Sequence, residues 1–188
     1  MEKLEVIDKK LREVVDEKRY IHCKLVAKEA KELAKIYNVD LDKAYLTGLT
    51  HDIAKRFTDD ENKKYVNKYK LDKSLLDDSY KKLLHADIGA IVVKEWFDFD
   101  DDMCDAIRYH TVARKDMTML AKIVFISDKI GRVEIPDELK GLKSIACHDI
   151  DKAMYIFLKR QREKFLSKGK DLKEETKELF DELKVKYE

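Results

Sequence analysis

The chain has 188 residues, of which 44% are hydrophobic and 42% are charged, enough apolar residues for one domain with a sizeable core. Lysine and arginine total 40 and aspartate and glutamate total 39, so the overall charge indicates neither a nucleic-acid partner nor a membrane surface. Three cysteines without a CxxC pair, no visible signal peptide and no apolar run of bilayer length lead us to expect a cytoplasmic protein.

Apolar residues recur at the helical period in almost every segment, and the alternation typical of strands is absent from the sequence. Asp40 is the expected N-cap of the third helix, and Thr58-Asp59-Asp60-Glu61 matches a capping box that begins the fourth. Gly169 is expected to end the helix before it. The predicted helices cover about residues 3–17, 19–37, 41–57, 59–69, 83–97, 101–110, 118–131, 142–167 and 171–187. The predicted fold class is all-α.

Six imidazole and carboxylate side chains are predicted to lie in apolar helical settings. They are His22, His51, Asp52, His85, His110 and Asp128. A buried charge without a partner is costly, so the adjacent pair His51-Asp52 needs a physical reason. Taken singly, His22, His85 and His110 each have a simpler interpretation as a core or helix-end residue, and Asp128 could pair with a lysine or arginine of another helix.

Taken together, the six side chains are best explained by a bound metal centre. Mixed imidazole and carboxylate ligands suit iron, zinc, manganese or nickel better than calcium. Six ligands exceed the four of a tetrahedral zinc site, so two adjacent ions that share Asp52 account for them better. The second His-Asp pair, His148-Asp149, is expected at the surface or as a local helix cap.

The order of these motifs is similar to that of the HD-domain superfamily of metal-dependent phosphohydrolases. His22, Leu49-Thr50-His51-Asp52-Ile53-Ala54-Lys55 and Asp128 carry the general resemblance. The segments Leu83-Leu84-His85-Ala86-Asp87-Ile88-Gly89-Ala90, Ala106-Ile107-Arg108-Tyr109-His110-Thr111 and 117–130 narrow it to the bacterial YqeK family.

This resemblance implies one HD-domain helical bundle over residues 1–188, with a metal-binding core of about 18–131 and C-terminal helices at about 142–187. It implies symmetrical hydrolysis of diadenosine tetraphosphate to two ADP molecules by a two-metal centre. Iron is the expected metal, with manganese, nickel, zinc and magnesium as alternatives. His22, His51, Asp52 and Asp128 match the ligands of the first metal. His85 and His110 match those of the second, with Asp52 bridging.

The same interpretation assigns roles around the metals. Asp52 and Lys55 are the predicted catalytic residues, because Lys55 lies one turn beyond Asp52 and can reach a phosphate oxygen or the leaving group. Predicted substrate-binding residues are Arg108 as a phosphate clamp, Thr111 as a hydrogen-bond donor to phosphate, and Tyr109 and Arg132 near the base or phosphates. Arg108 has an alternative as an ion pair with Asp102 or Asp105, and Lys55 as a surface lysine.

The expected partner is a small nucleotide, with ADP or GDP as product or analogue, and the sequence leaves a homodimer open. Three other functions remain at this point. One is a nucleotidase or pyrophosphohydrolase that acts on other nucleotides at the same metal site. Another is a nucleotide-binding regulatory module with a structural metal. The third is an all-α scaffold whose histidines only pack.

Overall fold

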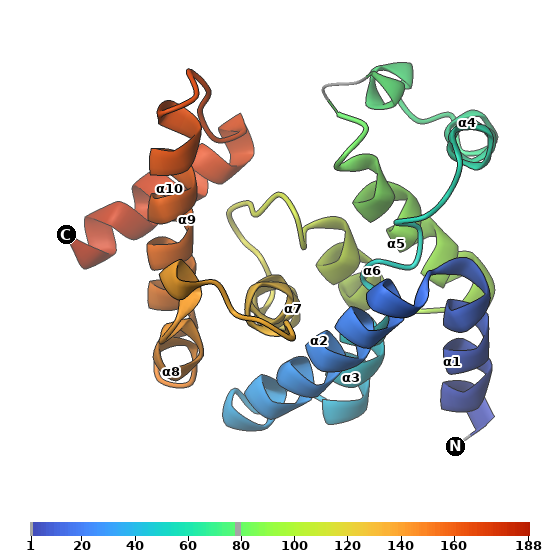
Figure 1. The fold of residues 1–188 in the computed structure, drawn as a ribbon, viewed down its shortest axis with the longest axis horizontal. Coiled ribbons are helices and arrows are strands. Elements are labelled where there is room, and N and C mark those ends of the chain that lie inside the picture. Colours follow the sequence, from blue (N-terminus) through green and yellow to red (C-terminus); the bar gives the residue numbers. More distant parts are fainter. Residues whose placement is uncertain (1, 78–79) are drawn as a thin grey trace.

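The computed structural model describes residues 2–77 and 80–188, which form ten α-helices, two short 3₁₀ helices and no strand (Figure 1). The α-helices are α1 (Glu2–Val14), α2 (Glu17–Ile36), α3 (Leu41–Thr50), α4 (Asp59–Lys68), α5 (Leu84–Phe97), α6 (Asp101–Arg108), α7 (Met119–Ile130), α8 (Leu142–Ala146), α9 (Ile150–Leu166) and α10 (Glu174–Tyr187); the 3₁₀ helices are η1 (Lys73–Leu76) and η2 (Asp137–Leu139). The predicted all-α class is confirmed. None of the described helices combines the length and hydropathy needed to cross a bilayer.

Side-chain caps fix where several helices begin. The Asp40 carboxylate accepts hydrogen bonds from the amides of Asp42 and Lys43 at the start of α3, as predicted. Thr58 and Glu61 form the predicted reciprocal capping box of α4. Gly169 has φ +68°, a left-handed conformation that glycine adopts without strain and that ends α9 as expected.

The helix predicted over residues 41–57 is shorter than expected. It ends at Thr50, and tight turns follow, with amide-to-carbonyl bonds from Ile53 to Thr50 and from Lys55 to Asp52. The ring of His51 donates to the carbonyl of Gly48, an acceptor that a continuing α-helix would use for the amide four residues later. The predicted helical setting of His51 and Asp52 is therefore wrong, since both lie in the turn after α3.

The helix predicted over residues 142–167 is divided in two. Helix α8 ends at Ala146, and Asp149 caps α9 by accepting from the amide of Lys152. His148 is exposed between the two helices. The prediction that His148-Asp149 is a surface pair or local cap is confirmed, and the cap is the reason for the break.

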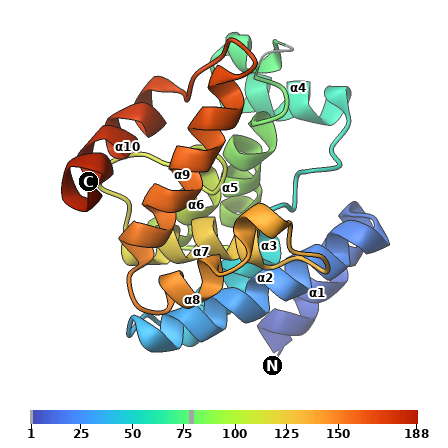
Figure 2. The ribbon, with the colours of Figure 1, turned by 60° about the vertical axis from the view of Figure 1, so that its left-hand side comes forward.

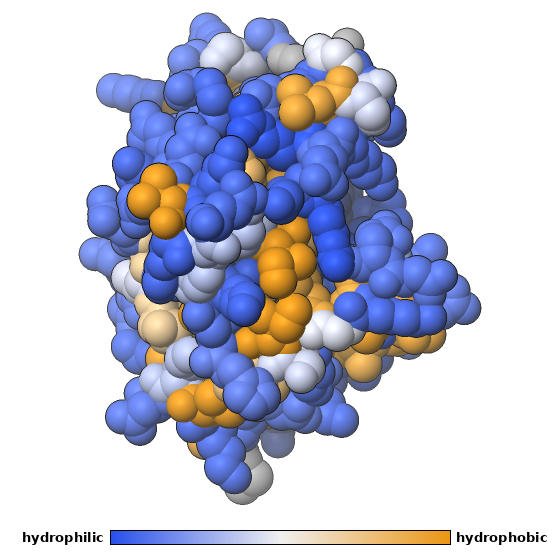
Figure 3. Space-filling model, turned by 90° about the vertical axis from the view of Figure 1, so that its left-hand side faces the viewer, coloured by the Kyte–Doolittle hydropathy of each residue, from blue (hydrophilic) through white to orange (hydrophobic). Residues whose placement is uncertain are grey.

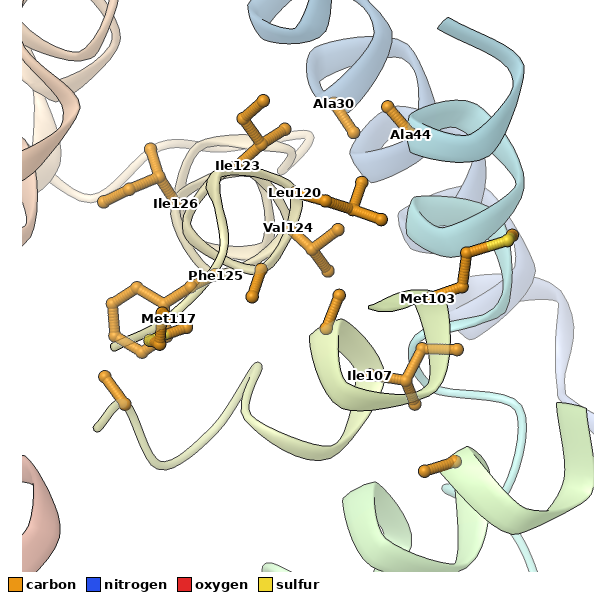
Figure 4. Close-up of a cluster of buried hydrophobic side chains, with 14 of the residues drawn as sticks. Ala30, Ala44, Met103, Ile107, Met117, Leu120, Ile123, Val124, Phe125 and Ile126 are labelled. Atoms are coloured by element: carbon orange, nitrogen blue, oxygen red, sulfur yellow. The ribbon is translucent and has the colours of Figure 1, made fainter. Parts of the chain in front are cut away.

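Helix α7 is the centre of the packing. It contacts α2, α3, α6 and α9, and Figures 1 and 2 show it enclosed by these helices. In Figure 4, Leu120 and Val124 point toward α3 and α6, whereas Phe125 lies on the opposite side of α7. The Phe125 ring meets Phe157 of α9 edge-on, with 5.6 Å between ring centroids. Because both sides of α7 are buried, residues near its end are held in a fixed position.

The C-terminal helices form a layer over this centre. Helix α9 packs on α7 and α10 packs on α9, and the Thr176 hydroxyl of α10 donates to the carbonyl of Ala113 over 2.7 Å. The face of the molecule on this side is mostly hydrophilic, with a short stripe of apolar side chains at its centre (Figure 3). This distribution fits a chain in which charged residues cover the surface and apolar residues fill the inside.

Gly48 lets α3 approach α2 closely. A Cβ atom added to Gly48 would lie 3.0 Å from the Cα of Ala27 and 3.1 Å from the carbonyl oxygen of Val26, both backbone atoms of α2. The close contact that the small residues Ala44 and Gly48 predicted is therefore present at Gly48. It sets the position of the turn that carries His51 and Asp52.

Gly48→Ala should destabilise the protein by about 1–3 kcal/mol, even though alanine is favoured over glycine in a helix interior by about 1 kcal/mol. Gly89→Ala in α5 is the matched control, because its added Cβ would first meet the Cγ2 of Ile107, a side-chain methyl that can move, at 3.3 Å. Urea unfolding of both variants measures the difference. A loss of stability in Gly48→Ala that is equal to or smaller than the loss in Gly89→Ala would contradict this account of the α2–α3 contact.

Candidate metal centre

The six predicted ligands meet at one place, although they come from five segments of the chain. His22 lies on α2, His51 and Asp52 lie in the turn after α3, His85 is at the start of α5, His110 follows α6, and Asp128 lies near the end of α7. Four of them are buried, namely His51, Asp52, His85 and His110, and the other two are partly buried.

All four histidine rings donate a hydrogen bond from Nδ1 to a backbone carbonyl. These bonds join His22 to Gly131 (3.0 Å), His51 to Gly48 (2.8 Å), His85 to Lys82 (3.0 Å) and His110 to Ile107 (2.6 Å). A neutral imidazole that donates from Nδ1 carries an unprotonated Nε2. Each ring therefore presents an Nε2 lone pair to the centre, which is the arrangement of metal-binding histidines.

The first half of the centre contains His22, His51 and one oxygen from each aspartate. Asp128 Oδ1 lies 3.0 Å from His22 Nε2 and 3.5 Å from His51 Nε2. Asp52 Oδ2 lies 3.5 Å from His51 Nε2 and 4.0 Å from His22 Nε2. Two imidazole nitrogens and two carboxylate oxygens thus face one volume.

The second half contains His85, His110 and the other oxygen of Asp52. Asp52 Oδ1 lies 3.0 Å from His85 Nε2 and 3.5 Å from His110 Nε2. The two Nε2 atoms are 3.3 Å apart. Since both rings donate from Nδ1, the facing Nε2 atoms have no proton to share, and their lone pairs repel unless a cation lies between them. Asp52 contributes to both halves, as the sequence predicted for a bridging ligand.

Two buried polar atoms of the centre have no hydrogen-bond partner among the described residues. They are His51 Nε2 and Asp52 Oδ1, one in each half. Leaving a buried acceptor unsatisfied costs about 1–3 kcal/mol, and more for a charged group. A metal ion in each half would satisfy both atoms, so the donor set fits a pair of cations.

The protonation states also fit metal binding. Burial opposes the ionisation of Asp52, but His51 above all, with the His110 and His85 rings, holds the pKa of Asp52 well below its usual value. Burial also opposes a charge on His51, but Asp52 and Asp128 outweigh it and raise the pKa of His51. Burial lowers the pKa of His110 to about 4 and also lowers that of His85. At neutral pH the second half therefore consists of neutral imidazoles around an ionised carboxylate.

Arg19 and Lys129 each neutralise one of the two aspartates, Arg19 on the Asp52 oxygen that also faces the first half and Lys129 on the second oxygen of Asp128. Arg19 donates to Asp52 Oδ2 over 2.6 Å, and Lys129 donates to Asp128 Oδ2 over 2.7 Å. Neither residue was predicted from the sequence. Signals were present, because Arg19 precedes His22 by three residues on one helix face, and Lys129 is an unexpected charge in the apolar run of α7.

A pocket of about 720 Å³ opens over the centre. Its lining includes the predicted residues Lys55, Thr111 and Arg132 together with the missed residues Lys18 and Arg19. Lys55 Nζ lies 3.1 Å from His85 Nε2, inside the site. The volume is typical of a small-molecule site.

Arg108 and Tyr109 do not line this pocket. The Arg108 guanidinium donates to Asp105 over 2.8 Å, which is the ion pair that the sequence left as an alternative. The Tyr109 ring lies under the guanidinium of Arg114, 4.1 Å from its carbon. The predicted substrate roles of Arg108 and Tyr109 stay predictions that this placement does not support.

A family model of the HD domain matches residues 19–133. The chain belongs to the HD domain family. The crystal structure of a predicted HD superfamily hydrolase involved in NAD metabolism from Clostridium acetobutylicum is similar over 97% of both chains, with a TM-score of 0.87 and 31% identity. The match to residues 19–133 includes all six candidate ligands of this HD-domain protein.

Curated relatives narrow the family further. The chain is 33% identical to the symmetrical bis(5'-nucleosyl)-tetraphosphatase of Bacillus subtilis (strain 168), over 79% of this chain and 80% of that protein. It is 35% identical to the Staphylococcus aureus (strain NCTC 8325 / PS 47) protein of the same name, over 79% and 78%. The predicted family of HD-domain enzymes is thereby confirmed.

A third relative is longer than this chain. It is a probable nicotinate-nucleotide adenylyltransferase/Ap4A hydrolase of Mycoplasma genitalium (strain ATCC 33530 / DSM 19775 / NCTC 10195 / G37), 34% identical over 71% of this chain. The chain matches 41% of the length of that protein. The similarity therefore concerns one part of the mycoplasma protein.

His110→Ala should reduce bound metal from two ions toward one ion per chain, because it removes an Nε2 ligand from the second half only. His148→Ala is the matched control, since His148 is the fifth histidine of the chain and its ring bonds only to the carbonyl of Ser144 at the surface. Elemental analysis of both purified variants gives the stoichiometry. Unchanged metal content in His110→Ala would remove His110 from the ligand set.

Proposed function

We propose that this chain hydrolyses diadenosine tetraphosphate symmetrically to two ADP molecules at a two-metal centre. The observation that carries the proposal is the paired donor set, in which Asp52 offers one oxygen to each of two histidine pairs. The names of the relatives from Bacillus subtilis and Staphylococcus aureus support the substrate. Iron is the proposed metal, with manganese, nickel, zinc and magnesium as alternatives.

The donor set suits ions that work on phosphate. His22, His51, Asp52 and Asp128 would hold the first ion, and Asp52, His85 and His110 the second. Two such ions supply charge to phosphate oxygens and lower the pKa of water for attack on phosphorus. The chain contributes by keeping His85 and His110 neutral, by holding both carboxylates ionised and by fixing their orientation through Arg19 and Lys129.

Cationic side chains of the pocket match the charge of the substrate. Lys18, Arg19, Lys55 and Arg132 line it, whereas the chain as a whole is almost neutral. A tetraphosphate carries several negative charges, and positive side chains around a low-dielectric pocket attract it. Lys55 lies beside His85, and its ammonium group is placed to donate a hydrogen bond to a bridging or leaving phosphate oxygen.

Product analysis tests this proposal directly. The purified, iron-loaded protein should convert one diadenosine tetraphosphate into two ADP molecules, separated and counted by anion-exchange chromatography. Formation of AMP and ATP would contradict symmetrical cleavage and favour a pyrophosphohydrolase. Tight ADP binding without turnover would favour a regulatory module.

Lys55→Ala should lower kcat/KM by roughly 30- to 1,000-fold, which corresponds to about 2–4 kcal/mol of transition-state stabilisation. The metal content should stay unchanged, because Lys55 is not a proposed ligand. The matched control is Lys64→Ala on α4, an exposed lysine outside the pocket, and steady-state kinetics compares the two. Equal activity of the two variants would remove Lys55 from the mechanism.

A further inference from the structure

Three charged residues of the pocket have no partner in the part of the chain that the structure describes. Lys18, Arg132 and Glu134 line the pocket, yet their side chains make no hydrogen bond or ion pair with any described residue. Charged side chains elsewhere around the centre are paired, as Arg19 and Lys129 are with Asp52 and Asp128. These three unpaired charges lie where a ligand of the pocket would meet them.

Glu134 is the residue that a phosphate pocket does not explain. Lys18 and Arg132 suit phosphate oxygens, but a carboxylate in the same lining repels them. The repulsion weakens with distance and is screened over about 8 Å at physiological ionic strength. Glu134 therefore has to face a part of the ligand that offers hydrogen-bond donors and carries no phosphate.

Val133 beside it is the apolar residue in the lining of this pocket. Its exposed fraction is 79%, although all other described lining residues are charged or polar. An exposed valine at the rim of a charged pocket gives a flat apolar group something to pack against. Val133 and Glu134 together thus offer one apolar contact and one anionic acceptor.

The segment is tied to the metal centre at its other end. Gly131 accepts the hydrogen bond from His22 Nδ1, and its Cα packs so closely on Val26 that an added Cβ would lie 2.8 Å from the Val26 Cα. Three further residues extend at most about 10 Å along the chain. Glu134 is therefore held near the centre, at the distance where the nucleoside of a bound nucleotide extends beyond its phosphates.

We propose that Val133 and Glu134 form the nucleobase subsite and determine specificity, with Val133 packing on the base and Glu134 accepting a hydrogen bond from an amino group of the base. Adenine presents such a donor at N6 and guanine at N2. This inference deepens the proposed function, because it names the part of the nucleotide that each end of the same pocket recognises.

Binding of nucleoside diphosphates to the metal-loaded protein tests the subsite without turnover, so its failure is distinct from failure of the hydrolase proposal. Wild-type protein should bind ADP about tenfold more tightly than N6,N6-dimethyl-ADP, which has no donor at N6, as measured by calorimetry. Glu134→Ala should lose this preference by weakening ADP binding. Glu134→Gln should recover part of it, because an amide oxygen still accepts.

Two comparisons separate base recognition from a general effect on the pocket. Inorganic pyrophosphate has no base, so Glu134→Ala should bind it as tightly as the wild type does. Glu138→Ala is the matched control variant, because Glu138 is an exposed glutamate of η2 that does not line the pocket, and it should keep the ADP preference. Equal wild-type affinity for the two diphosphates, or an equal loss of pyrophosphate binding in Glu134→Ala, would overturn the proposal.

Discussion

The bond from each histidine Nδ1 to a backbone carbonyl is the interaction on which the centre depends. In His51, His85 and His110 the acceptor lies three residues earlier in the chain, so the ring is oriented by its own turn of backbone. Gly48 and Ile107 lie in the last turn of their helices, where carbonyls lack intrahelical partners. The rings satisfy those carbonyls and in return point Nε2 inward. The local backbone geometry thus determines the direction in which each Nε2 atom points before any ion is bound.

The two aspartates need a different kind of support. An ionised carboxylate in a buried site is costly unless a positive charge lies beside it. Each has a cation on one oxygen, Arg19 for Asp52 and Lys129 for Asp128. The Lys129 ammonium also lies 4.8 Å from the centroid of the Phe125 ring, so the core of α7 helps to hold it. Removing one partner of such a pair leaves an uncompensated charge, which is more costly than either charge in water. Arg19 and Lys129 therefore orient the carboxylates as well as neutralise them.

Features of the fold that local sequence patterns determine were predicted correctly. Features that depend on tertiary contacts were not. The helical period and the caps at Asp40 and Thr58 were sufficient for the fold class and for most helices. The end of α3 was misplaced because the bond from His51 to Gly48 is a side-chain interaction that periodicity does not encode. The approach of the six ligands followed from their residue types and order. In contrast, the sequence left Arg108 open between a phosphate clamp and an ion pair, and the pairing with Asp105 outside the pocket is a tertiary placement that its residue type does not encode.

Gly131 links the two ends of the pocket. Its carbonyl orients His22, which contacts the metal-facing oxygen of Asp128, and its lack of a side chain allows the end of α7 to touch Val26 of α2. The residues that follow Gly131 form the rim of the pocket, where the unpaired charges of Arg132 and Glu134 are exposed. A shift of Gly131 would move the candidate ligand His22 and the rim together. The geometry of the candidate metal centre and the geometry of the pocket rim therefore share one fixed point of the backbone.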